Sequence, residues 1–175
     1  KKGFTKKKIE GDRTTPNGSY SLGNIYYRAD RVQKPQSKLK LISIRKNMGW
    51  CDDPKSKFYN RLIKINKRLK IKYEKLYRKD NKYDFFILIK YNYINPIKFR
   101  GSAIFLHLTK NYLPTKGCIA INKKDFLILI KLKGSAIFLH LTKNYLPTKG
   151  CIALCEKDFL ILAKLINKKT KIKIN

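Results

Sequence analysis

The sequence predicts a mainly β fold, and two patterns in it support that class. Short apolar runs rich in Ile, Phe and Tyr recur along the chain, and most are shorter than an ordinary helix. Dipeptides that favour turns separate these runs, at Lys34-Pro35, Asp53-Pro54 and Asn95-Pro96. Runs and turns at such intervals are typical of an open sheet or a sandwich.

The first long strand is predicted directly after a turn at Thr15-Pro-Asn-Gly18, in which the proline presets its own φ and the glycine permits a positive one. The segment Lys64–Lys79 carries many charges with poor periodicity, so we expect it to be irregular or weakly helical. The predicted strands are Ser19–Tyr27, Leu39–Ile44, Tyr83–Tyr91 and Ser102–Leu108.

A block of 32 residues occurs twice, as Gly101–Leu132 and Gly134–Leu165, and the two copies differ at four positions. Each copy carries one of the two histidines and a Gly-Cys pair, and a short helix is predicted after each pair. In the first copy Asn122 is a suitable N-cap for that helix. Two units are too few for a solenoid, so we interpret one copy as an insertion into a single domain.

The histidine and the Gly-Cys pair in each copy suggest a thiol nucleophile with its base. His107 lies eleven residues before Cys118, at the end of an apolar run, and Gly117 precedes the cysteine. Gly117 lets the backbone approach a ligand closely, and the amides of Gly117 and Cys118 are candidates for an oxyanion hole. The alternative is structural, because cysteine is common in cores and buried histidines are often only hydrogen-bonded.

These residues resemble the YkuD-type L,D-transpeptidases of bacterial cell walls. The segment Thr115-Lys116-Gly117-Cys118 is similar to the family's Ser/Thr-His-Gly-Cys signature, with Lys116 in place of the histidine. Glu10–Tyr20 looks like the Gly-Asp and Thr-Pro-x-Gly segment that opens many of these domains. Gly49–Pro54, followed by Tyr59-Asn60, resembles one bacterial branch of the family.

The resemblance implies a β-sandwich catalytic domain that transfers acyl groups between peptidoglycan stem peptides. Cys118 would form a thioester with the donor peptide, His107 would move the proton, and an amine of a second stem peptide would accept the acyl group. With water as the acceptor the reaction is hydrolysis, and an inactive relative is a further alternative. The candidate substrate-binding residues are Arg100, Thr115 and Lys116.

Copy one is expected to form the site, since it directly follows the strand Tyr83–Tyr91 and contains the Asn122 cap. The alternative is copy two, with Cys151, His140 and Gly150 in the same roles. We expect no cofactor and no metal site, because the two histidines lie in separate copies and the chain has no Cys-x-x-Cys pair.

The net charge of +31 raises a second hypothesis, a nucleic-acid-binding protein. Only eight of the 42 cationic residues are arginine, and the lysines are spread along the chain. Arginine is the residue suited to bidentate contacts with phosphates and bases, so we expect no specific recognition of nucleic acid. The same charge favours non-specific contact with anionic envelope polymers or lipid surfaces.

Length and composition predict one domain over residues 1–175, with a substantial core. The longest apolar runs are far shorter than the ~20 residues of a membrane-spanning helix. The chain begins without a methionine, inside the part that resembles the family domain, so we expect an N-terminal truncation. The resemblance implies a location in the bacterial cell envelope or periplasm.

Overall fold

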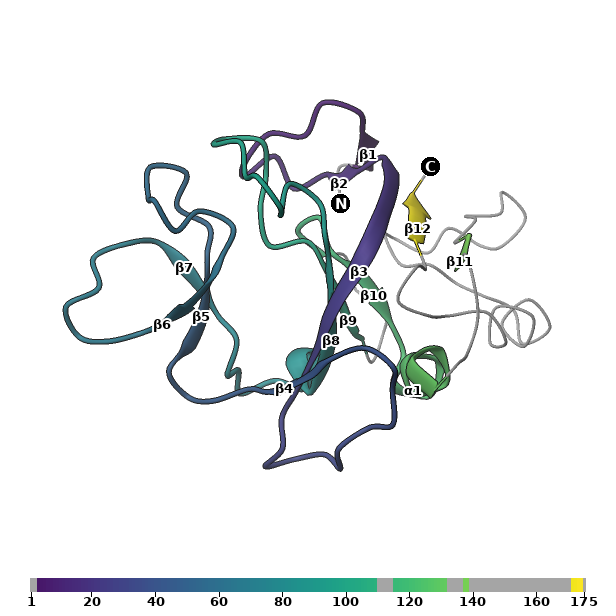
Figure 1. Ribbon diagram of the computed structural model, residues 1–175. Helices are drawn as coiled ribbons and strands as arrows, with labels where there is room; N and C mark the ends of the chain where they lie inside the picture. Colours follow the sequence, from purple (N-terminus) through teal and green to yellow (C-terminus); the bar gives the residue numbers. More distant parts are fainter. Residues whose placement is uncertain (1–2, 110–114, 132–136, 139–170, 175) are drawn as a thin grey trace.

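The computed structural model describes residues 3–109, 115–131, 137–138 and 171–174, and in this part of the chain strands predominate (Figure 1). The predicted mainly β class is therefore confirmed. The described residues form a main sheet in the order β10-β9-β8-β3-β12-β11, with β4 paired to the end of β3. Its strands are β3 (Gly18–Tyr27), β4 (Leu41–Ser43), β8 (Phe85–Ile89), β9 (Phe105–Leu108), β10 (Ile119–Ile121), β11 (Ile137–Phe138) and β12 (Lys171–Ile174).

Two smaller sheets accompany the main one. A pair of two-residue strands, β1 (Phe4–Thr5) and β2 (Thr15–Pro16), runs parallel near the N-terminus. A three-stranded antiparallel sheet has the order β6-β5-β7 and comprises β6 (Leu62–Lys64), β5 (Met48–Cys51) and β7 (Tyr73–Lys75). The helical elements described are the 3₁₀ turn η1 (Asn81–Tyr83) and the helix α1 (Lys123–Lys131).

The four predicted strands are present, with narrower bounds at most ends. The helix expected after Gly117-Cys118 is α1, and Asn122 caps it: the Asp125 amide donates to Asn122 Oδ1 at 2.9 Å. The helix expected after Gly150-Cys151 lies outside the described residues.

The prediction for Lys64–Lys79 was wrong in part, because β7 occupies Tyr73–Lys75. This strand has only three residues, and two of them, Glu74 and Lys75, are charged, so it shows no alternation of apolar and polar residues. Its pairing with β5 is made by the backbone. β5 and β6 were also not predicted, since each is too short to show a period.

The main sheet is covered on both faces, which explains why β8 is apolar at every position (Figure 1). Phe85, Ile87 and Ile89 pack toward α1, in a cluster with Leu106 and Phe126. The alternate residues pack toward the β6-β5-β7 sheet. That second cluster contains Tyr26, Ile44, Trp50, Leu76, Tyr83, Phe86, Leu88 and Phe105.

Asn60 connects the small sheet to the segment that enters β9. Asn60 is buried, and its own backbone has a positive φ of 55°. Asn60 Oδ1 accepts from the indole of Trp50 at 2.9 Å and from the amide of Ala103 at 3.1 Å. Its Nδ2 donates to the carbonyls of Tyr91 and Asn92, at 3.1 and 2.6 Å. One side chain thus fixes two segments of backbone and the indole of Trp50.

We expect Asn60→Ala to lower the free energy of unfolding by about 3 kcal/mol, because it leaves the buried Trp50 and Ala103 donors without an acceptor. Urea denaturation measures the change. The matched control is Asn47→Ala at an exposed position, which should change stability by less than about 0.5 kcal/mol. Equal stability of the two variants would contradict this account.

Candidate active site

Strand pairing brings the predicted base and nucleophile to one face of the main sheet. β9 and β10 run parallel, with His107 opposite Ala120, so Cys118 lies beside Phe105 just before β10 begins. Side chains alternate along a strand, and His107 therefore shares a face with Phe105 and Cys118, while Leu106 and Leu108 face α1. This face is the one covered by Trp50 and Tyr83.

The Cys118 thiol is partly exposed and donates to the carbonyl of Ala103 at 3.3 Å. Ala103 has a positive φ of 53°, and its amide is held by Asn60. Ala103 therefore directs its carbonyl at the Cys118 sulfur, while Asn60 holds its amide. The positive φ of Ala103 is incompatible with a β-strand, and it explains why β9 begins at Phe105 although the sequence predicted a strand from Ser102.

His107 is buried and its tautomer follows from its hydrogen bond. The distance from Nδ1 to the Leu108 carbonyl is 2.9 Å, so Nδ1 carries the proton and Nε2 has the free lone pair. Burial lowers the pKa of His107 to about 4, and the nearby cations Lys82 and Arg78 also lower it. The imidazole is accordingly neutral at physiological pH and able to accept a proton at Nε2.

The turn before Cys118 needs its glycine. Gly117 has a φ of +113°, and a Cβ added there would lie 2.4 Å from the Thr14 carbonyl oxygen. The close approach is therefore made by the chain itself, at the N-terminal segment. The Thr115 hydroxyl donates to the Cys118 carbonyl at 2.5 Å, which closes the same turn. Both residues shape the backbone at the nucleophile.

A polar group next to the site was not predicted from the sequence. The ring of Tyr83 meets that of His107 edge-on at 5.5 Å, and its hydroxyl donates to Glu74 at 2.5 Å. Burial raises the pKa of Tyr83 well above its usual value, with Cys118 and Glu74 as further causes. Burial also raises the pKa of Glu74, which Arg78 and Lys116 partly counteract. The sequence did not predict this pair, because Glu74 lies in a strand too short to show a period. The feature that could have indicated it is a carboxylate in a very basic chain.

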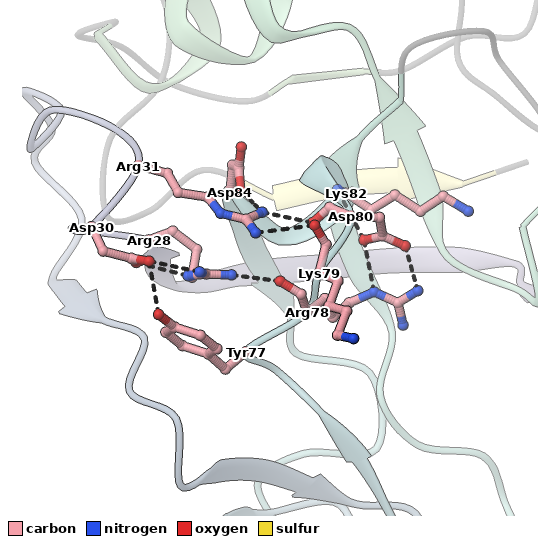
Figure 2. Close-up of polar contacts among 9 residues, drawn as sticks. All are labelled: Arg28, Asp30, Arg31, Tyr77, Arg78, Lys79, Asp80, Lys82 and Asp84. Atoms are coloured by element: carbon pink, nitrogen blue, oxygen red, sulfur yellow. Dashed lines mark hydrogen bonds and ion pairs between the residues drawn. The ribbon is translucent and has the colours of Figure 1, made fainter.

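Two arginines hold the backbone that carries Tyr83 (Figure 2). Arg28 is buried and donates to the Arg78 carbonyl at 2.6 Å, while its other nitrogens bind the Asp30 carboxylate. Arg31 donates to the carbonyls of Lys79 and Asp80, at 3.0 and 3.1 Å. These contacts fix residues 78–80 against the end of β3, and η1 then sets the ring of Tyr83 on His107.

The other predicted site residues are placed as follows. Arg100 is exposed on the loop before β9, and Lys116 is exposed beside the nucleophile turn. His140, Gly150 and Cys151, the residues of copy two, lie outside the described part of the chain. Among the residues the structure describes, no three His, Cys, Asp or Glu side chains are grouped so as to hold a metal ion.

Comparison with known proteins shows the family of the chain. Residues 3–132 match the L,D-transpeptidase catalytic domain family, YkuD. The chain belongs to this family. No curated protein and no solved structure gave a significant match. The family match ends at Leu132, which is also the last residue of copy one. Family membership supports a role connected with peptidoglycan, and no helix in the described residues is long and apolar enough to cross a membrane.

The buried His107 should make folding stability depend on pH. Between about pH 6.5 and about pH 4 the unfolded chain binds a proton at this residue and the folded chain does not. The contribution of His107 to the free energy of unfolding is therefore full above pH 6.5, and about 3 kcal/mol of that free energy is lost as the pH falls to about 4. We expect His107→Gln to remove this part of the pH dependence in urea denaturation, and the matched His140→Gln to retain it. A wild-type pH dependence in His107→Gln would contradict the assignment.

We expect Gly117→Ala to lower the free energy of unfolding by at least about 2 kcal/mol, because its Cβ meets the Thr14 carbonyl and its φ is unfavourable for alanine. Thermal or urea denaturation measures the loss. Gly150→Ala, the same change in copy two, is the control, and it should have the smaller effect. The reverse order would assign the turn against Thr14 to copy two.

Proposed function

We propose that this protein is a cysteine-dependent acyltransferase that acts on peptidoglycan stem peptides, with Cys118 as nucleophile and His107 as base. The main support is the parallel pairing of β9 with β10, which puts both side chains on one face of the sheet. Family membership supplies the substrate class. The neutral Nε2 of His107 supplies a proton acceptor at physiological pH.

In the first half-reaction the thiol turns from the Ala103 carbonyl toward His107 and gives its proton to Nε2. The sulfur then attacks a peptide carbonyl of the donor stem, beside a D-centre. Negative charge develops on the carbonyl oxygen, and the amides of Gly117 and Cys118 stabilise it. The C–N bond breaks, and the leaving amine takes the proton from His107, which leaves a Cys118 thioester.

In the second half-reaction an amine of another stem peptide attacks the thioester and His107 takes its proton. The new amide forms, the C–S bond breaks, and the proton returns to the sulfur. Because the pKa of His107 is low, the resting pair is a neutral thiol with a neutral imidazole, and the proton moves when a substrate carbonyl is present. Burial of His107 under Tyr83 limits the access of water to the base, which favours transfer over hydrolysis.

Tyr83 is proposed as a positioning residue, because it touches the imidazole ring rather than the reacting atoms. Lys116 and Arg100 are the cations available to bind a carboxylate of the donor peptide. Thr115 acts by closing the turn before the nucleophile. We propose copy one as the working copy, since its strand β9 pairs directly with β8 and its end coincides with that of the family match. The proposed location is the bacterial cell envelope or periplasm.

We expect incubation with a carbapenem to add one drug mass to the intact protein, on Cys118. Trypsin releases Gly117–Lys123 for copy one and Gly150–Lys157 for copy two, so peptide mapping identifies the modified thiol. Cys118→Ala should abolish the adduct and the matched Cys151→Ala should keep it. His107→Gln should slow acylation by about 10²-fold or more.

The same variants are then tested on stem peptides with an amine acceptor present. A cross-linked product supports transfer, and release of the terminal residue alone identifies a hydrolase. An adduct on Cys151 alone would exchange the roles of the two copies. No adduct and no turnover by a folded sample would show an inactive relative.

A further inference from the structure

The large apolar side chains that are exposed in the described residues gather on three adjoining loops. We call these residues, 6–13, 52–62 and 90–101, the three-loop surface, at the upper left of Figure 1. Exposure reaches 76% for Ile94 and 64% for Ile97. Isolated exposed apolar residues are normal, but a cluster of them marks an interaction surface. The exposed residues are Ile9, Phe58, Leu62, Ile94, Ile97 and Phe99.

Hydrogen bonds hold the three loops against one another. The amide of Glu10 donates to the Phe99 carbonyl at 2.8 Å, which joins the first loop to the third. Arg61 donates to the Ile94 carbonyl at 2.9 Å and also to that of Tyr93, which joins the second to the third. The three loops that carry the exposed apolar side chains are therefore held next to one another.

The third loop is a built structure that presents these side chains outward. The Asn92 amide group donates to the carbonyls of Ile97 and Gly101, both at 2.9 Å, and accepts from the Ile97 amide at 2.8 Å. The Tyr91 hydroxyl donates to the Arg100 carbonyl at 2.6 Å. Phe99 has a positive φ of 64°, which is unfavourable for a bulky residue. A strained loop that is held by its own hydrogen bonds and exposes isoleucine and phenylalanine points to a functional surface.

The fully exposed charges around these apolar residues have one sign. The four carboxylates on the loops are partly buried. Glu10 accepts from Tyr59 and Ser102, Asp12 accepts from Lys8, and Asp52 lies 3.9 Å from the Lys72 ammonium. Asp53 likewise accepts from a backbone amide of its own loop. The exposed cations on the surface are Lys6, Lys7, Arg13, Lys55, Lys57, Lys90, Lys98 and Arg100.

We propose that the three-loop surface docks the protein on an anionic lipid bilayer. Apolar side chains bordered by lysines match the two parts of such a surface, an acyl region and a layer of negative headgroups. A soluble polyanion would be bound by the cations alone and would leave the isoleucines and phenylalanines in water. Docking is independent of the proposed acyl transfer, although the third loop leads directly to Ala103 and so to Cys118.

The test is co-sedimentation of the full chain with large unilamellar vesicles of phosphatidylglycerol and phosphatidylcholine, against vesicles of phosphatidylcholine alone. We expect binding to the anionic vesicles, weakened by salt. The double variant Ile94→Ser with Ile97→Ser should weaken it at least about tenfold, since it removes inserted apolar area. The triple variant Lys55→Gln, Lys57→Gln and Lys98→Gln should weaken it by a similar factor or more.

The matched control is Lys34→Gln with Lys38→Gln and Lys40→Gln, which removes the same charge from exposed lysines of the loop between β3 and β4, at the other end of β3 (Figure 1). We expect it to bind within about threefold of the wild type. Thermal unfolding confirms that every variant is folded. The proposal is overturned if the isoleucine variant binds as the wild type does, if the control loses as much as the loop variant, or if the surface causes self-association without vesicle binding.

Discussion

The pairing of β8, β9 and β10 is the constraint on which the rest of the site depends. β9 is antiparallel to β8 and parallel to β10, so its register fixes both neighbours at once. A shift of β9 by one residue would turn His107 to the α1 side and bring Leu106 or Leu108 to the polar side. Both faces of this sheet are covered by apolar side chains, so such a shift would place leucine among the aromatic rings and the imidazole among the isoleucines. The core thereby specifies the face on which His107 lies.

The second requirement is a polar arrangement that compensates for the burial of the base. An imidazole among Tyr83, Phe86 and Phe105 is far from water, and one of its nitrogens needs a partner. The Leu108 carbonyl provides it, from the backbone of the same strand end. The arginine contacts to residues 78–80 then matter to the base indirectly, because they hold the tyrosine that packs on its ring. The contacts that stabilise this part of the fold therefore also determine the position of His107.

The sequence predicted the long elements well and the local geometry poorly. Gly18–Tyr27 and Phe85–Ile89 are long or strongly apolar, and both were expected. Met48–Cys51 and Tyr73–Lys75 were not, because three or four residues carry no measurable period and their pairing is a backbone property. His107 and Cys118 were found from residue type and spacing. Glu74 and Asn60 were missed as site components, since their roles arise from contacts across 9 and 43 residues of chain.

The duplicated block shows why spacing alone does not place a strand. Phe105 and Phe138 stand at equivalent positions of identical surrounding sequence. Yet Phe105 pairs with Leu88 in an antiparallel arrangement, whereas Phe138 pairs with Lys173 of β12 in a parallel one, at the far edge of the same sheet. Intrinsic preference is equal for the two segments, so their partners differ because of context. Copy one follows β8 through a loop that Asn60 and Asn92 fix, and this direct connection makes the antiparallel pairing with β8 the accessible one. The position beside β8 admits one strand, and its occupation by β9 leaves Ile137–Phe138 the other edge.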